Sequence, residues 1–333
     1  MKKNRWFMLG VSLIVMMGLG ACAPDKQSGS TTNEASNQND GDKVYQIGVS
    51  QFVEHPSLDA AYEGFQDAIE EAGLNVEYDY RNAQGDQSNT STIAQNFVAD
   101  QVDLIFANAT PSAQAALQAT RETPIVFTSV TDAVEAGLVA ELDQTDGNIT
   151  GVLDMHPDAI VETINFIEQY FPDSTIGVVY NAGEQNSVIQ IEHVNDAVQD
   201  TSLTVVERTV ATSAEVQQAT TSLVGEVDLL YIVTDNTVVS ALETVVAVAN
   251  EQKLPLIVGE PDSLERGGFA TFGIDYYTIG YRTGEMAVDI LTGSKDLADI
   301  SVEYPPEIQL FINESAAEKQ GIEWNADWDD AAQ

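Results

Sequence analysis

The feature that most limits how this chain can fold is an alternation between short apolar runs and amphipathic segments, which extends from Lys43 to the end of the sequence. Continuous apolar strands that alternate with helices predict parallel sheets covered on both faces. We therefore expect an α/β fold with strands at Tyr45–Ser50, Val76–Tyr80, Leu104–Ala107, Ile125–Ser129, Gly151–Leu153, Ile176–Tyr180, Thr204–Val210, Leu229–Val233, Leu256–Gly259 and Gly268–Phe272. The helices are expected at Leu58–Ala72, Ser88–Asp100, Pro111–Thr120, Asp158–Tyr170, Ser187–Asp200, Ser213–Leu223, Val238–Asn250 and Ile279–Thr292.

This alternation occurs twice, because three landmarks recur in the same order. Residues 102–117 align with residues 227–242, residues 47–49 with residues 176–178, and residues 123–126 with residues 254–257. Any one match can arise by chance in an α/β protein, but the three keep nearly the same spacing. The repeat therefore favours two similar lobes, each with its own parallel sheet.

Polar segments follow the predicted strands, and in open α/β folds ligands bind in a crevice at the carboxyl ends of the strands. Most of these segments also precede helices, so plain helix capping by Ser, Thr, Asn and Asp remains an alternative for any single residue. From these segments we select candidate ligand-binding residues: Phe52, Glu54, His55, Thr110, Ser112, Ser129, Asn181, Glu184, Asn186, Ser187, Thr234, Asp235, Asn236, Glu260, Asp275 and Tyr276.

The N-terminal segment has the pattern of an export signal. A basic start precedes an apolar run from Trp6 to Leu19, which is shorter than the roughly 18 or more apolar residues that cross a bilayer. Leu19-Gly20-Ala21-Cys22 resembles the lipobox of bacterial lipoproteins, in which the Cys is lipidated; an ordinary secreted protein with a chance free Cys is the alternative. We expect a signal peptide at 1–21, a lipid at Cys22 and a flexible polar tether at 22–42, with the protein on the outer face of the cell membrane.

The charge balance excludes several functions. The chain has 53 acidic and 13 basic residues and a formal net charge of −40. Nucleic-acid binding needs clustered cations and is therefore not expected. The acidic residues are spread along the chain, which indicates a solvated surface that tolerates its self-repulsion best in salt, where the Debye length is about 3 Å at 1 M. We therefore expect a halophilic or alkali-tolerant source.

Several polar local motifs occur at residues 51–60, 82–87, 109–114, 127–132, 180–187 and 273–280. Together they resemble the tryptophan/tyrosine-type (TrpX-like) family of ABC transporter substrate-binding lipoproteins, and the resemblance runs from about Lys43 to Ile312. Ala133 is a departure, since the family usually has Pro after Thr-Asp. The resemblance implies a type I periplasmic-binding-protein fold, with two Rossmann-like lobes joined by a three-stranded hinge. It also implies capture of an aromatic amino acid and delivery to an ABC permease and its ATPase.

Carried onto this sequence, the family places the hinge crossings near residues 150–151, 273–276 and 293–300. Lobe 1 is then 43–150 plus 277–300, and lobe 2 is 151–276 plus 301–333. We expect a monomer that needs no cofactor.

A zwitterionic amino acid needs three kinds of partner. Its carboxylate needs donors, which helix N-termini supply at Thr110–Ser112 and Asn186–Ser187. Its ammonium needs an acceptor, for which the candidates are Asp235, Glu184 and Asp275. Its ring needs apolar faces, for which the nearest candidates are Phe52, Tyr276 and Tyr277.

The sequence also bears on other functions. For His55, a ligand contact and a loop-ordering hydrogen bond remain equally open, whereas His156 and His193 have the pattern of surface or packing residues. The histidines are too far apart in sequence for a transition-metal motif. The nucleophile elbow, the phosphate loop and the dinucleotide fingerprint are absent from the mature sequence, so an enzyme is not expected. Binding of a sugar or another small polar solute, a sensory ectodomain and an adhesin remain as alternatives.

Overall fold

The computed structural model describes residues 43–143, 147–305 and 308–332. These residues belong to one unit of the chain, Gly41–Gln333. The expected signal peptide, Cys22 and the expected tether lie outside the described residues.

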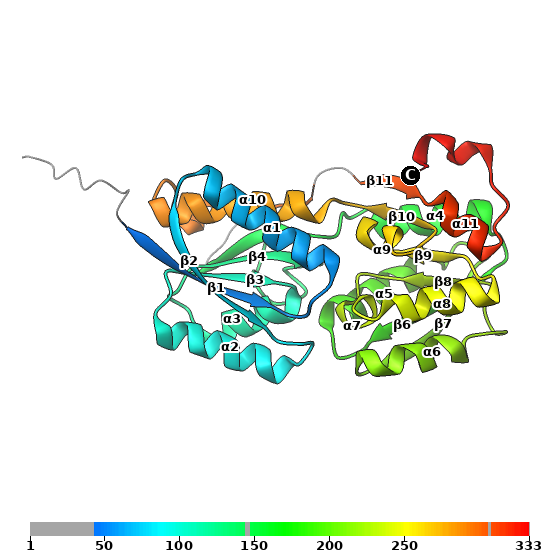
Figure 1. Cartoon of the computed structure of the whole chain (residues 1–333), viewed down its shortest axis with the longest axis horizontal. Coiled ribbons are helices and arrows are strands. Elements are labelled where there is room, and N and C mark those ends of the chain that lie inside the picture. The colour runs from blue at the N-terminus through cyan, green and yellow to red at the C-terminus, as the bar shows by residue number, and fades with distance from the viewer. Residues whose placement is uncertain (1–42, 144–146, 306–307, 333) are drawn as a thin grey trace, which may run out of the picture. The chain divides into compact units, whose positions relative to one another are not determined.

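The described residues form two sheets (Figure 1). The first sheet has the strand order β2-β1-β3-β4-β5, and all its pairs are parallel. Its strands are β1 (Val44–Gln51), β2 (Asn75–Asn82), β3 (Leu104–Asn108), β4 (Ile125–Val130) and β5 (Ile149–Leu153). The second sheet has the order β11-β10-β9-β8-β6-β7 and is parallel except for the pair of β10 with β11. Its strands are β6 (Thr175–Asn181), β7 (Thr204–Val210), β8 (Leu229–Ile232), β9 (Leu256–Val258), β10 (Ala270–Gly273) and β11 (Gln309–Ile312).

Helices cover both faces of each sheet. In the first sheet, α1 (Pro56–Glu71) and α10 (Tyr276–Thr292) cover one face, while α2 (Gln87–Asp100) and α3 (Thr110–Ala119) cover the other (Figure 1). The remaining helices are α4 (Ala159–Tyr170), α5 (Gln185–Ala197), α6 (Val216–Ser222), α7 (Asn236–Val239), α8 (Leu242–Gln252), α9 (Pro261–Glu265) and α11 (Glu314–Gln320). Strand β3 shows why its sequence is apolar throughout. Leu104 and Phe106 enter the core under α1, whereas Ile105 enters the core under α2 and α3.

The internal repeat is visible in the strand order and in single hydrogen bonds. The order β2-β1-β3-β4 in the first sheet corresponds to β7-β6-β8-β9 in the second. Asp103 accepts the backbone N–H of Gln46 at 2.8 Å, and the equivalent Asp228 accepts that of Thr175 at 2.8 Å. The same short sequence, Val-Asp before a buried strand, thus starts the same parallel pair in both halves.

The structure differs from the sequence prediction in a few elements. Strand β11 and helices α9 and α11 were not predicted, and the single helix expected at Val238–Asn250 is two helices, α7 and α8. The break follows Ser240, whose hydroxyl donates to the carbonyl of Thr237, and Ala241 leaves the helical conformation with φ −120° and ψ 23°. Strand β11 is a four-residue edge strand, too short to show a clear period in sequence.

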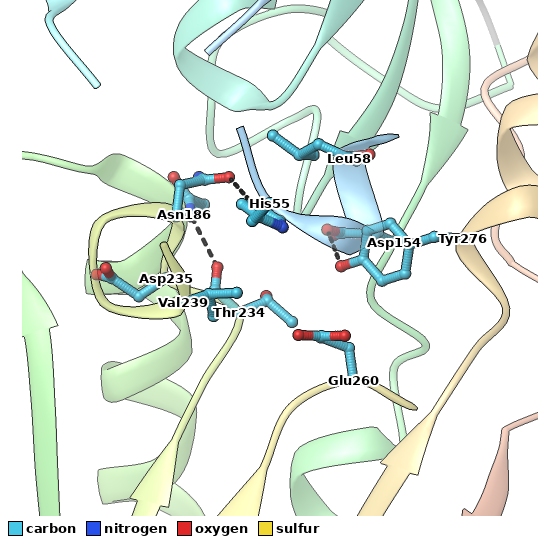
Figure 2. A pocket seen from close by; sticks show the side chains of 11 residues that line it. His55, Leu58, Asp154, Asn186, Thr234, Asp235, Val239, Glu260 and Tyr276 are labelled. Atoms are coloured by element: carbon cyan, nitrogen blue, oxygen red, sulfur yellow. Dashed lines mark hydrogen bonds between the residues drawn. The ribbon is translucent and has the colours of Figure 1, made fainter. Parts of the chain in front are cut away.

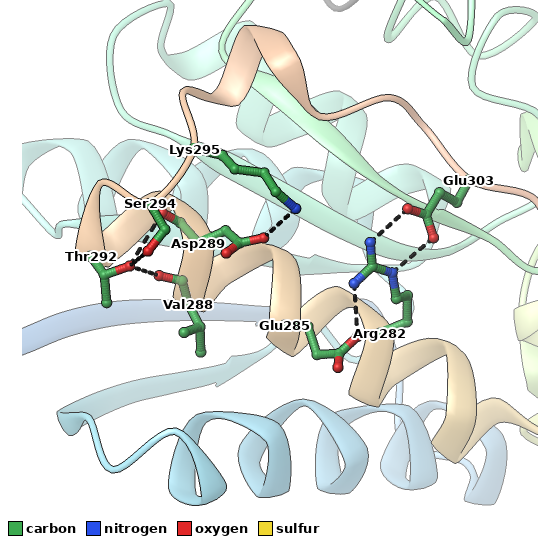
Figure 3. Close-up of polar contacts among 8 residues, drawn as sticks. All are labelled: Arg282, Glu285, Val288, Asp289, Thr292, Ser294, Lys295 and Glu303. Carbon is green, nitrogen blue, oxygen red and sulfur yellow. Dashed lines mark hydrogen bonds and ion pairs between the residues drawn. The ribbon is translucent and has the colours of Figure 1, made fainter.

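Helix α10 returns to the first sheet through a close contact with α1. A Cβ on Gly280 would lie 1.9 Å from the carbonyl oxygen of Ala61, so the two backbones approach too closely for any side chain there. Farther along α10, Arg282 pairs with Glu303 through two hydrogen bonds of 2.7 and 2.8 Å (Figure 3). The backbone of Glu303 also donates to Gly151 and accepts from Leu153, which ties this segment to β5.

Candidate functional site

A small cavity opens at the carboxyl ends of the strands of both sheets (Figure 2). The space left free inside it is about 10 Å³, enough for about one water molecule, so a larger ligand enters only if the lining side chains move apart. The described residues that line it are His55, Leu58, Ser129, Asp154, Asn186, Thr234, Asp235, Asn236, Val239, Glu260 and Tyr276. None of these is Lys or Arg, while three of them are carboxylates.

The sequence brings these residues together because each lies where a parallel strand ends or where the next helix begins. His55 is the N-cap residue of α1, Ser129 lies in β4, and Asp154 follows β5 directly. From the second sheet, Asp235 is the N-cap residue of α7, and Glu260 is that of α9. Parallel strands end at one edge of their sheet, so residues far apart in the chain meet there.

Ser129 has a strained backbone. Its φ is +58°, which is uncommon for a residue other than glycine, and it lies where the register between β4 and β5 shifts. Its hydroxyl is buried and has no hydrogen-bond partner. Strain of this kind gathers at binding sites, where it directs a side chain toward a ligand.

Asp154 and Tyr276 form a hydrogen-bonded pair at the cavity (Figure 2). The phenol of Tyr276 donates to Oδ2 of Asp154 at 2.8 Å, whereas Oδ1 is buried without a partner. Burial raises the pKa of Asp154 to about 6, against the lowering effect of hydrogen bonds from the side chains of Tyr276 and Thr131. The carboxylate therefore has one oxygen held in place and one with unused acceptor capacity.

Glu184 and Asp235 are buried carboxylates whose acceptor capacity is already used. Glu184 accepts from the backbone and side chain of Asn236 and from the backbone and side chain of Thr237, at 2.6 to 3.3 Å. Asp235 accepts from the backbone N–H groups of Asn181 and Val238 at 2.6 and 2.7 Å. Burial, followed by the nearby Asp235 charge, raises the pKa of Glu184 to about 7. Both side chains hold the segment from Asn236 to Val238 in place.

Hydrogen bonds join the segments after the first sheet to those after the second. The hydroxyl of Ser57 donates to Oε2 of Glu260 at 2.7 Å, and Glu260 also accepts from the hydroxyl of Ser263. Nε2 of His55 lies 3.4 Å from Oδ1 of Asn236. Burial lowers the pKa of His55 to about 4, so this imidazole is neutral at physiological pH.

Four buried polar atoms of the cavity residues lack partners. They are Nδ1 of His55, Oγ of Ser129, Oδ1 of Asp154 and Oδ1 of Asn186. Buried polar groups in folded proteins nearly always have a hydrogen-bond partner, and an unpaired one costs about 1–3 kcal/mol. A bound ligand rich in hydrogen-bond donors would satisfy these atoms.

Half of the residues predicted from sequence line this cavity: His55, Ser129, Asn186, Thr234, Asp235, Asn236, Glu260 and Tyr276. Glu184 and Ser187 are buried at α5, where Glu184 acts on the cavity through Asn236. Thr110 and Ser112 are buried at the start of α3, and the hydroxyl of Ser112 accepts from that of Ser50.

The other predicted residues lie elsewhere. Phe52 and Asn181 line a separate, more open groove together with Gln87 and Gly183. Glu54 and Asp275 are exposed, and Asp275 caps α10 by accepting from the backbone of Thr278. Tyr277 lies at the surface and donates to Asp67.

Sequence reasoning missed Leu58, Asp154 and Val239. Asp154 had a usable signal, because it is a polar residue directly after the predicted strand Gly151–Leu153, but it was not selected as a candidate. Leu58 and Val239 are apolar residues in helices, and nothing in their sequence distinguishes them from core residues.

Two kinds of feature are absent from the described residues. Within them, no group of three or more His, Cys, Asp and Glu side chains is arranged to hold a metal ion. In the same part of the chain, no helix is long and apolar enough to cross a membrane.

Comparisons with known proteins agree with this fold. The family model for ABC transporter substrate binding proteins matches residues 46–331. The tyrosine-binding protein of Clostridioides difficile (strain R20291) is 44% identical over 312 residues, which are 91% of this chain and 90% of that protein.

Two solved structures match this chain over 87% of its length and over 99% of the length of the solved chain. The ABC domain from Streptococcus pneumonia in complex with L-Trp has 33% identity and a TM-score of 0.81. The ligand-free, open structure of CD0873, a substrate binding protein with adhesive properties from Clostridium difficile, has 39% identity and a TM-score of 0.63. The predicted fold class and the predicted family are confirmed. The chain belongs to the ABC transporter substrate-binding protein family.

Proposed function

We propose that this protein captures an aromatic amino acid in the cavity between its two sheets and delivers it to an ABC permease. The observation that carries the proposal is the set of unpaired acceptor atoms around a cavity lined by carboxylates and by no cation among the described residues. Such a site favours a ligand with an ammonium group. The relatives named for tyrosine binding and for a complex with L-Trp support an aromatic side chain.

Asp154 is the residue that we propose for the ammonium. Its Oδ1 is buried and unpaired, so a ligand N–H can form a charge-assisted bond with it. The three acceptors expected from sequence are less suitable. Both oxygens of Asp235 and of Glu184 already accept backbone N–H groups, and Asp275 is exposed.

The carboxylate and the ring of the ligand have partners of other kinds. The N-termini of α1, α5 and α10 converge on the cavity through His55, Asn186 and Tyr276, and helix N-termini favour anions. Leu58, Val239 and the Tyr276 ring supply apolar surface.

We propose that each sheet with its helices forms one lobe, and that the two lobes close on the ligand. The Ser57–Glu260 bond and the bond from Gln87 Nε2 to the carbonyl of Gly183 both join the two sides. This chain has a higher TM-score with the L-Trp complex than with the open, ligand-free structure, although it is more identical to the latter in sequence. That difference supports a closed arrangement here. If each lobe contains one sheet, the chain first passes from lobe 1 to lobe 2 after Leu153, and it passes between them for the last time after Glu303.

The membrane attachment and the assembly are further parts of the proposal. The Leu-Gly-Ala-Cys motif supports a signal peptide at 1–21, a lipid on Cys22 and a tether at 22–42. The ABC transporter family supports an extracytoplasmic location and a permease with its ATPase as partners. We propose a monomer that binds its ligand without catalysis.

A thermal-shift and calorimetry panel tests the proposed ligand class. The twenty amino acids and a set of sugars would be titrated against the purified soluble chain that starts after Cys22. Tryptophan, tyrosine or phenylalanine should stabilise the protein, since a ligand that binds only the folded state raises its melting temperature. Stabilisation by sugars alone, or no stabilisation by any of the three aromatic amino acids, would refute the proposal.

A further inference from the structure

The amide of Asn236 has a fixed orientation, because one of its ends contacts a carboxylate. Nδ2 of Asn236 donates to Oε2 of Glu184 at 2.6 Å. The two oxygens of Glu184 also accept the backbone N–H groups of Asn236 and Thr237, so the carboxylate is held as an acceptor on both sides. Oδ1 of Asn236 must then face the other way, toward Nε2 of His55.

This orientation fixes the tautomer of His55. A carbonyl oxygen only accepts, so we assign the proton of the neutral ring to the Nε2 that lies 3.4 Å from it. The imidazole is buried and neutral, so its other nitrogen, Nδ1, has a bare lone pair. That nitrogen has no partner within the described residues and belongs to a side chain that lines the cavity.

We propose that Nδ1 of His55 accepts a hydrogen bond from the aromatic side chain of the ligand, from an indole N–H or a phenol O–H, and thereby selects tryptophan and tyrosine over phenylalanine. The inference rests on the proposed function and adds the residue that recognises the polar group on the ligand's ring. Glu184 and Asn236 are positioning residues that hold His55 as an acceptor.

The ring is a better partner for His55 than the ammonium is. The unpaired oxygen of Asp154 offers a charged acceptor for a cation, whereas His55 offers a neutral one. The positive charge of Arg266 also opposes positive charge at His55. A neutral donor on the side chain is therefore the ligand group that suits His55.

Calorimetry on the unmodified protein gives the first test. Tyrosine differs from phenylalanine only in the phenol, and phenylalanine would leave Nδ1 unpaired in a closed cavity. We expect tyrosine and tryptophan to bind about 10- to 100-fold more tightly than phenylalanine. Equal affinity for tyrosine and phenylalanine would overturn the inference but leave the proposed function intact. If no aromatic amino acid binds, the proposed function itself fails.

Variants separate the ring contact from an ammonium contact. His55→Leu should weaken tyrosine and tryptophan about 10-fold or more, leave phenylalanine nearly unchanged and remove the preference between them. An equal loss for all three ligands would assign His55 to the ammonium and overturn the inference. His193→Leu, on the exposed face of α5, is the matched control and should change none of the affinities.

The tautomer can be measured without any substitution. Nitrogen-15 NMR of the histidine rings distinguishes an Nε2–H from an Nδ1–H imidazole. We expect the Nε2–H form for His55 in the free protein and a hydrogen-bonded Nδ1 after addition of tyrosine. An Nδ1–H form in the free protein would contradict the inference, even if His55→Leu did not fold.

Discussion

Replacing Asp154 by Asn should change stability and affinity in opposite directions. Asn keeps the shape of the side chain and can still accept from Tyr276, but it carries no charge. Burial raises the pKa of Asp154 from 3.8 to about 6. A carboxyl group with a raised pKa in the folded state destabilises the fold once it ionises. This loss of folding stability is absent below pH 3.8 and complete above about pH 6. The change from 3.8 to about 6 corresponds to about 3 kcal/mol, since one pKa unit is about 1.4 kcal/mol.

The ligand-free Asp154→Asn protein should therefore be more stable than the unmodified protein at pH 8, by up to about 3 kcal/mol, and equally stable near pH 3.5 if both remain folded. Its affinity for an aromatic amino acid should fall about 10- to 150-fold, because a hydrogen bond to a charged group contributes about 1.5–3 kcal/mol. Urea unfolding at the two pH values measures the first effect, and calorimetry at pH 8 measures the second. Ser301→Ala, an exposed substitution outside the cavity, is the control. An Asp154→Asn protein that binds as tightly as the unmodified one would refute the assignment of the ammonium to Asp154.

Three other predictions concern pH, packing and salt. Affinity for the ligand should fall as the pH drops below about 6, because protonation removes the Asp154 charge; calorimetry between pH 5 and pH 8 that shows a constant affinity would contradict this. Gly280→Ala should destabilise the protein by about 1–3 kcal/mol, because its Cβ would lie 1.9 Å from the Ala61 carbonyl oxygen. Thr278→Ala, on the exposed side of α10, should destabilise it much less. Thermal melts compare the two variants, and equal melting temperatures would contradict the prediction. The melting temperature should rise between low salt and about 1 M salt, because salt screens the repulsion within a chain of net charge −40; a melt that is unchanged argues against adaptation to salt.

The sequence predicted the fold well because the strands are buried on both faces. Leu104, Ile105 and Phe106 are apolar in succession, which is typical of a strand that is covered on both faces. The edge strand β11 lies partly at the surface, with a mixed burial pattern, and its four residues carry no such signal. The break between α7 and α8 follows Ser240, whose hydroxyl bond to the Thr237 carbonyl is equally compatible with a continuous helix, so the sequence carries no signal for it.

The site was predictable only in part, because sequence shows which residues follow strands but not which atoms are already paired. Asp235 and Glu184 were expected to take the ammonium. Each of their carboxylate oxygens, however, already accepts a backbone N–H group, from Asn181, Asn236, Thr237 or Val238. Asp154 has the free oxygen, and this depends on Tyr276, which lies more than a hundred residues away in the chain. Such long-range pairing leaves no local pattern.

The most direct test of this account is a crystal structure of the protein with L-tyrosine. The account predicts the amino acid inside the cavity, with its ammonium within hydrogen-bond distance of Oδ1 of Asp154 and its phenol within hydrogen-bond distance of Nδ1 of His55. A ligand bound outside the cavity, or an ammonium that contacts neither oxygen of Asp154, would contradict it.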